Sequence, residues 1–192
     1  MVTIYKICPD YEGYSLASTD TDAFLSQYSR LRALQRLRSE WKKLTFYVHD
    51  PVWTKEMDFY HLSTGIVAFR QRVYESNLGE QLDRCGDVLP AVREDNGEEF
   101  YVLNPLACFN CLNRAMTKLR TTPDGKTVVQ IFNYAFHPNR IGGESVFRIP
   151  ETHLTELYAS SGVISPDEEF YHQYQANGFS GLKFNKLWAE GE

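Results

Sequence analysis

The sequence predicts an α+β fold in which two similar strand-helix-strand units and β-hairpins form a mixed or antiparallel sheet with helices on its faces. The first observation is a repeated order of events. Residues 58–93 and 146–188 each run from an aromatic start through a short apolar strand, an amphipathic helix and a glycine to a closing strand. The second is Asn96-Gly97 between two strand-like segments, because this dipeptide favours a tight hairpin turn. Units this short cannot bury their apolar faces alone, so we expect them to pack together or on a shared sheet.

These units belong to the second of two segments that we expect within one compact domain. Residues 1–57 supply an N-terminal strand and a basic amphipathic helix, and residues 58–192 hold both units. The chain has 192 residues, of which 43% are hydrophobic. That is enough to bury a sizeable core.

The N-terminal segment begins with alternating apolar and polar residues over 2–8, which predict a strand. Asp20 then supplies an N-cap, and apolar residues three or four positions apart extend the predicted helix to Trp41. The other side of this helix carries the main basic cluster of the chain, namely Arg30, Arg32, Arg36, Arg38, Lys42 and Lys43. We interpret the cluster as a solvated face, with an anionic partner as the alternative.

The first unit follows a short strand. Residues 44–49 predict this strand, and Asp50-Pro51 ends it because proline cannot continue a ladder inside a sheet. Residues 65–69 predict the strand of the unit itself. Its helix follows over about 73–82 and is weakened by Gly79.

Two hairpins and a short helix are expected between the units. The first hairpin spans residues 88–103. Pro105 then favours a helix over 104–114, since proline suits the first helical position. The second hairpin spans 118–136 and turns at Gly125.

The second unit follows the glycine-containing segment 137–143, which is the best candidate for a mobile loop or for the joint between the units. Ser165-Pro166 predicts a helix start with a capping box, and Asn177-Gly178 predicts the end of that helix. Residues 181–188 alternate sharply and predict a half-buried final strand.

The four cysteines contain one motif. Cys108 and Cys111 have the C-x-x-C spacing of a zinc or thioredoxin-type site, whereas Cys8 and Cys85 are isolated. A structural zinc needs two more ligands, and no second pair is present. We therefore interpret Cys108 and Cys111 as small residues on the buried side of a helical turn, with metal or redox chemistry as the alternative.

The histidines do not predict a catalytic, cofactor or metal site. The chain contains five of them, His49, His61, His137, His153 and His172. Asp50 beside His49 and Asp58 three residues before His61 lack a third group at a spacing that imposes geometry. His172 follows Glu169 by three positions, which on a helix predicts a solvent-facing pair.

Known catalytic motifs for phosphate, dinucleotide, acyl and zinc chemistry are missing from the sequence. We therefore do not expect an enzyme, and the alternative is a small enzyme whose dispersed polar groups assemble only in the fold. The net charge of -5 disfavours a nucleic-acid partner. No apolar run is long enough for a membrane span, and the first residues lack the layout of a signal peptide, so we expect a cytoplasmic protein.

Several short segments together resemble a known bacterial family. They are Asp58-Phe59, Gly65-Ile66-Val67-Ala68-Phe69, Phe100-Tyr101-Val102-Leu103-Asn104, Val146-Phe147-Arg148-Ile149 and Gly178-Phe179-Ser180-Gly181-Leu182-Lys183-Phe184. The region from Asp58 to Trp188 is similar to an immunity-protein-like family, formerly of unknown function, that is found beside polymorphic toxins and has myxobacterial members. The chain departs from that family at Cys108 to Cys111, where aliphatic residues and an aspartate are more usual.

The resemblance implies that the protein binds one cognate toxin in the cytoplasm of the producing cell and blocks it without turnover, catalytic residues or a cofactor. We expect steric occlusion through central aromatic anchors and a charged rim. Tyr171 and the acidic turn from Glu94 to Glu99 are the first places to look, although the sequence assigns no interface. A structural or regulatory protein of a phage or secretion locus is a further alternative, and a homodimer is plausible.

Overall fold

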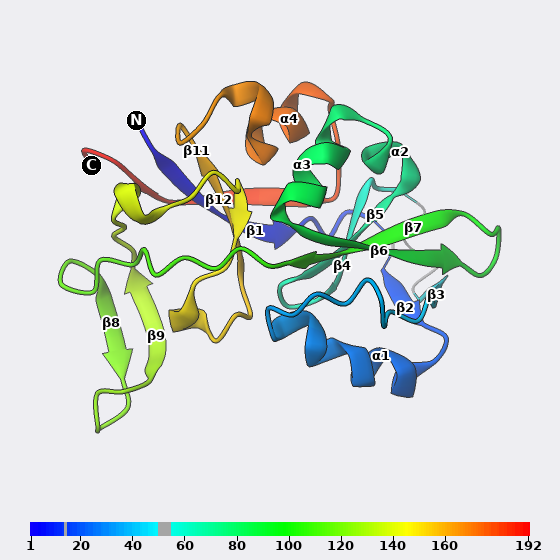
Figure 1. Ribbon diagram of the computed structural model, residues 1–192, viewed down its shortest axis with the longest axis horizontal. Helices are drawn as coiled ribbons and strands as arrows, with labels where there is room; N and C mark the ends of the chain where they lie inside the picture. The colour runs from blue at the N-terminus through cyan, green and yellow to red at the C-terminus, as the bar shows by residue number, and fades with distance from the viewer. Residues whose placement is uncertain (14, 50–54) are drawn as a thin grey trace.

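The fold places two β-sheets side by side with helices on both faces, and a separate hairpin projects from one end (Figure 1). This computed structural model describes residues 1–13, 15–49 and 55–192. The predicted α+β class with mixed and antiparallel sheets is confirmed. The predicted stop of a strand at Asp50-Pro51 lies outside the described residues.

The described residues form a four-stranded sheet in the order β10-β11-β1-β12, a six-stranded sheet in the order β2-β3-β6-β7-β5-β4, and the two-stranded hairpin β8-β9. Neighbouring strands are antiparallel except β3 and β6. The strands are β1 Thr3–Pro9, β2 Leu16–Ser18, β3 Leu44–Val48, β4 Phe59–Ser63, β5 Ile66–Arg70, β6 Gly86–Arg93, β7 Glu99–Pro105, β8 Lys118–Thr121, β9 Val128–Asn133, β10 Val146–Phe147, β11 Leu157–Ser161 and β12 Leu182–Ala189.

The helices are short and lie above and below these sheets (Figure 1). The α-helices are α1 Thr21–Tyr28, α2 Gln71–Tyr74, α3 Asn77–Cys85 and α4 Phe170–Ala176. The single-turn 3-10 helices are η1 Arg30–Arg32, η2 Pro138–Arg140, η3 Pro150–Thr152 and η4 Pro166–Glu168.

The two predicted units share one topology. Strands β5 and β6 both pair antiparallel with β7, so they run parallel to each other with β7 between them. Strands β11 and β12 both pair antiparallel with β1 and are parallel in the same way. In each unit a helical crossover joins the two parallel strands, and α3 packs against α4. The repeated order in the sequence therefore corresponds to a repeated fold.

Three core clusters explain the layers. The first lies between helices α2 to α4 and one face of both sheets, with Phe59, Leu82 and Phe170 among its members. The second lies between α1 and the other face of the six-stranded sheet. The third lies on the face of the four-stranded sheet that α4 leaves uncovered, and it is closed by the segment before β8 and by the hairpin.

The predicted N-terminal helix is wrong beyond its first turns, because α1 ends at Tyr28 and only the single turn η1 follows. The cap is correct, since Asp20 accepts a hydrogen bond from the backbone N–H of Ala23. Further on, the buried carboxylate of Asp87 accepts the backbone N–H of Leu37 at 2.6 Å. Tertiary contacts of this kind hold the chain in turns and irregular structure and override the helical spacing.

The helix of the first unit is divided in two, which was not predicted. A Cβ on Gly79 would lie 2.0 Å from the backbone oxygen of Tyr74, so the close turn between α2 and α3 requires glycine. Ser76 caps α3 by accepting the backbone N–H of Leu78. Gly79 is therefore a requirement of the fold and not merely a weak point of a helix.

The predicted helix over 104–114 is wrong. Asn104 and Pro105 end strand β7, and the chain then stays extended. The backbone of Arg148 donates to Ala107 O and accepts from the N–H of Phe109, both at 3.0 Å. Because strand β10 and its continuation satisfy these backbone groups, a helix has no advantage here.

The second unit also starts its helix differently from the prediction. Residues 166–168 form only η4, and the hydroxyl of Ser165 donates to the carboxylate of Asp167 and does not cap. Glu169 is fully buried and accepts the backbone N–H groups of Val163 and Ile164. The predicted solvent-facing pair of Glu169 and His172 is therefore wrong.

The remaining predictions of elements are confirmed. Both hairpins form where expected, and their turns place Gly97 and Gly125 at φ angles of +71°. Gly178 takes φ +63° after α4, and the final strand is half-buried. The segment 137–143 contains η2, and its mobility stays a prediction.

Candidate functional site

A groove runs along the face of the four-stranded sheet that α4 does not cover. Side chains alternate along β1, so Tyr5 and Ile7 face α4 and its core while Lys6 and Cys8 face the groove. Three neighbouring hollows of about 460, 410 and 190 Å³ make up this groove.

The three hollows adjoin one another, because each shares lining residues with the next. Lys6, Thr155 and Glu156 line both the first and the second. Val128, Glu151 and His153 line both the second and the third. We call the whole depression the β1 groove. Its other lining residues include Cys8, Tyr11, His61, Lys183, Asn185, Val129, Tyr134, Arg114 and Lys126.

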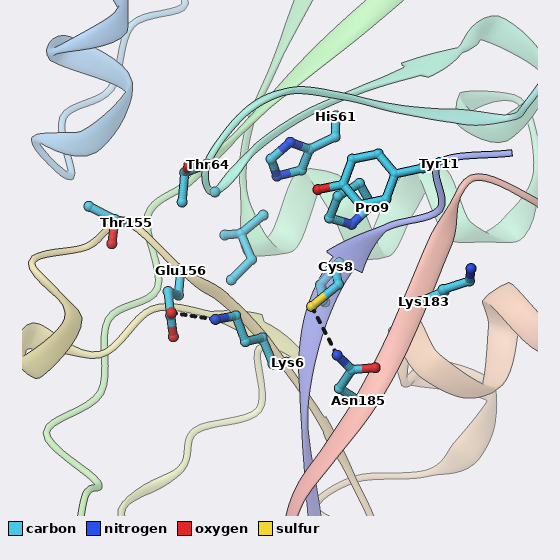
Figure 2. Close-up of a pocket in the computed structure, with 13 residues that line it drawn as sticks. Lys6, Cys8, Pro9, Tyr11, His61, Thr64, Thr155, Glu156, Lys183 and Asn185 are labelled. Carbon is cyan, nitrogen blue, oxygen red and sulfur yellow. Dashed lines mark hydrogen bonds and ion pairs between the residues drawn. The ribbon is translucent and has the colours of Figure 1, made fainter. Parts of the chain in front are cut away.

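An ion pair between Lys6 and Glu156 occupies the centre of the β1 groove (Figure 2). The hydroxyl of Tyr158 donates to Glu156 Oε2 at 2.6 Å, and the hydroxyl of Tyr134 reaches the same oxygen at 3.4 Å. Burial alone lowers the pKa of Lys6, but the hydrogen bond and charge of Glu156 outweigh it and the pKa is raised. Lys6 is therefore charged at neutral pH and is not a general base.

Cys8 and His61 are the groups of the first hollow that most resemble catalytic residues (Figure 2). Burial raises the pKa of the Cys8 thiol, so the thiol is protonated at neutral pH and is not an activated nucleophile. It accepts a hydrogen bond from Asn185 Nδ2 at 3.3 Å. Burial lowers the pKa of His61 and favours its neutral imidazole.

The rim of the β1 groove carries exposed apolar side chains. Tyr11 is 79% exposed at the end of the first hollow, and Val129 is 52% exposed beside the second. Lys183 lies at the same end as Tyr11 and pairs with Asp10 at 3.0 Å. The groove therefore combines paired charges on its floor with unburied apolar groups on its rim.

The histidines do not gather in one place. His61 and His153 line different hollows, and the ring of His153 lies 3.1 Å from Val128 O. His49, which is exposed, His137 and His172 line none of the three hollows. Asp50, the predicted neighbour of His49, lies outside the described residues.

A serine, a histidine and a glutamate meet near α4 and need separate consideration. His172 Nε2 lies 2.9 Å from Ser161 Oγ and 3.4 Å from Glu169 Oε2. In a hydrolase triad the acid and the nucleophile bond to opposite nitrogens of the ring, whereas here both approach one nitrogen. The cluster therefore lacks the geometry of a triad.

The C-x-x-C motif lies on extended chain and not on a helical turn. Cys111 is buried in the third core cluster, where burial raises its pKa to about 12, and Cys108 is half-buried with a raised pKa. Both thiols are free. Within the described ranges, no three His, Cys, Asp or Glu side chains are close enough together to hold a metal ion.

The acidic turn after β6 is partly neutralised by the chain itself. Arg70 Nε pairs with Glu98 at 2.5 Å, and Arg93 Nε pairs with Asp95 at 2.6 Å. Lys43 lies 3.6 Å from Glu99. The free negative charge of this turn is therefore smaller than the sequence indicates.

Tyr171 is not a free aromatic anchor. Its ring stacks on Tyr5 with centroids 4.3 Å apart, and it also meets the edge of Phe184. The sequence offered no signal for the central groups of the groove, since Lys6 and Glu156 are 150 positions apart.

The chain matches no protein-family model, and a search of curated proteins finds no relative. None of the helices in the described part of the chain is both long and apolar enough to cross a membrane.

Proposed function

We propose that this protein is a cytoplasmic immunity protein that binds a cognate bacterial toxin and neutralises it without catalysis. One observation supports this function above the others. The β1 groove is open and already formed, the central charges of its floor are paired, and exposed Tyr11 and Val129 stand on its rim. A recess with apolar rim groups and a paired charge at its centre is typical of a protein-binding surface.

The state of the groups in the groove favours binding over turnover. Glu156 accepts hydrogen bonds from Lys6, Tyr158 and Tyr134, so its oxygens already have donors. Cys8 is a protonated thiol. A nucleophile must be deprotonated at the operating pH, and the raised pKa of Cys8 opposes this. Among the described residues of the first hollow, the neutral imidazole of His61 is the one group whose state suits a general base, and it is tested below.

The proposed mechanism is steric. A segment of the toxin lies in the β1 groove, with the ring of Tyr11 and the side chain of Val129 packing against its apolar residues. The Lys6–Glu156 pair offers a partner both signs of charge, and covering it costs less than covering an unpaired ion, because each ion already has its counter-ion. While this segment of the toxin is bound in the groove, it cannot contact the cellular target of the toxin.

The alternative function is a small enzyme, and one observation favours it. His61, Cys8 and Glu156 line the same hollow, which is the convergence that an active site of dispersed residues requires. Under this alternative, His61→Ala abolishes the effect of the protein on cells while complex formation is preserved. Under the immunity function, the same variant protects nearly as well as the wild type.

The test is a pull-down of the purified chain against the product of the neighbouring gene, followed by growth of cells that produce this product with and without the chain. Tyr11→Ser should weaken capture and protection and leave the melting temperature within about 2 °C, because an exposed side chain contributes little to stability. Tyr47→Ser is the matched control, since Tyr47 is 38% exposed and lies outside the groove. Equal protection by both variants would remove the groove from the proposal.

A further inference from the structure

The hairpin β8-β9 and the turn before it carry an excess of positive charge on an acidic protein. Residues 114–134, which we call the basic hairpin, contain Arg114, Lys118, Arg120 and Lys126 but only one acidic residue, Asp124. The whole chain has a net charge of -5. All four basic side chains are exposed. The hairpin projects from the end of the four-stranded sheet (Figure 1).

The charges of the basic hairpin have no counter-ion within the described part of the chain. None of its four cations forms an ion pair there. The basic residues that follow α1 are different. Arg30 pairs with Glu40 at 2.5 Å, and Arg38 pairs with Asp83 at 2.9 Å. The sequence therefore suggests a basic surface at α1, whereas the folded chain leaves unpaired cations on the hairpin.

Two β-bulges place apolar groups beside these charges. Thr121 pairs with Val128 and Arg120 with Gln130, so Val129 is an extra residue in β9. Leu119 pairs with Ile131 and Lys118 with Asn133, so Phe132 is a second extra residue in β9. Val129 and Phe132 are 52% and 54% exposed, although other residues of the hairpin reach the core. A bulge re-aims a side chain and disrupts local pairing, which prevents these residues from joining the core.

The outer face of the hairpin thus has a defined chemistry. Leu119 and Ile131 pair with each other and pack on the third core cluster. Their neighbours Lys118, Arg120 and Phe132 are exposed, and side-chain alternation points the two cations away from the core. Cations surrounding an exposed ring form a surface that complements carboxylates around an apolar pocket.

We propose that the basic hairpin is the docking arm of this protein and that its partner is an acidic protein surface with an apolar recess. This inference rests on the proposed function and assigns an acidic face to the toxin. The arm adjoins the β1 groove, since Val128 to Ile131 form one wall of the second hollow. A toxin seated in the groove therefore contacts the hairpin at the same time.

Two other polyanions fit this surface less well. A nucleic-acid strand carries a phosphate at every nucleotide, so its charge would extend beyond the four cations of the hairpin over a chain whose net charge is -5. A bilayer needs a larger apolar face than Val129, Phe132 and the exposed Met116 supply. A folded protein can instead match cations and apolar groups one by one.

The test compares two variants with the same change of net charge. Lys118→Glu/Arg120→Glu alters the arm, and Lys42→Glu/Lys43→Glu alters an exposed basic site on another part of the chain. Association with the purified product of the neighbouring gene is measured for the full chain at low and at physiological salt. We expect the arm variant to associate about tenfold more slowly and to lose most of its salt dependence, because rim charges act mainly on the association rate. The control variant should behave like the wild type.

A second set of probes separates the arm from the identity of the partner. It contains a short Glu-rich peptide with leucines, poly-deoxythymidine, and vesicles of phosphatidylserine and phosphatidylcholine. Binding of the peptide by the wild type and its loss in the arm variant would support the docking arm even if the neighbouring gene product does not bind, in which case only the immunity function fails. Equal behaviour of both variants, stronger binding of the oligonucleotide or the vesicles, or no binding of any probe would overturn the inference.

Discussion

The carboxylate of Glu156 supports a buried hydroxyl, and its removal tests how the centre of the β1 groove is held. Tyr158 is fully buried, and its hydroxyl donates to Glu156 Oε2 at 2.6 Å. Lys6 pairs with the same carboxylate, but its side chain is 34% exposed. Glu156→Ala therefore leaves the buried hydroxyl of Tyr158, the more distant hydroxyl of Tyr134 and the partly solvated cation of Lys6 without their acceptor.

The two losses differ in size. A buried hydroxyl that loses its acceptor costs about 1–3 kcal/mol in the free energy of unfolding. A partly exposed ion pair contributes about 0–1 kcal/mol after solvent screening. We therefore expect Glu156→Ala to destabilise the protein by about 1–4 kcal/mol, with most of the cost arising from Tyr158.

The assay is urea unfolding followed by circular dichroism in two backgrounds. Tyr158→Phe removes the main donor, so Glu156→Ala added to Tyr158→Phe should cost about 1 kcal/mol or less, because only the weaker contacts of Tyr134 and Lys6 remain to be lost. The dependence of the unfolding free energy on urea concentration should stay constant across the series. If Glu156→Ala lowers the free energy of unfolding equally in the wild type and in Tyr158→Phe, the buried hydroxyl of Tyr158 is not the main source of the cost and the reasoning is refuted.

Two further predictions concern glycines and thiols. Gly79→Ala should destabilise the protein by more than about 2 kcal/mol despite the helix preference of alanine, since its Cβ would meet the backbone oxygen of Tyr74. Gly97→Ala should cost only about 1 kcal/mol, because Gly97 lies in open space and the cost comes from its φ of +71° alone. Similar urea midpoints for the two variants would contradict this difference. Burial raises the pKa of Cys85 to about 11 and that of Cys111 to about 12, so a thiol reagent should modify these two cysteines only after unfolding. Modification of Cys111 in the native protein, detected by mass spectrometry, would contradict this prediction.

Local signals in the sequence predicted the parts of the fold that local physics determines. Asn96-Gly97 and Gly125 occupy turns that need positive φ angles, and both hairpins form around them. The repeat predicted two units, and both have the same crossover topology. These signals succeed because turn geometry and side-chain periodicity depend on adjacent residues.

Long-range contacts explain the failures. The spacing up to Trp41 is helical, but the buried carboxylate of Asp87 binds the backbone N–H of Leu37 and holds the segment in a non-helical conformation. Pro105 suggested a helix start, but Arg148 supplies strand-like backbone partners to the residues that follow. Neither partner is near in sequence, so the competing interaction was invisible.

The candidate site was even less predictable than the fold. Lys6 comes from the first strand and Glu156 from the residue before β11, and only the sheet brings them together. The prominent basic cluster after α1 is largely paired, whereas the unpaired cations and bulge residues lie on a hairpin that the sequence showed only as alternating strands. Pairing between distant charges decides which surface is free, and composition does not reveal it.

The most direct measurement of the central claim is hydrogen exchange of the chain alone and in complex with the product of the neighbouring gene. The account predicts slower exchange in the segments that line the β1 groove, namely residues 6–11, 128–134 and 151–157, with little change at α1 and at the turn after β6. Protection confined to α1 or to that turn, with unchanged exchange along the groove, would contradict the account.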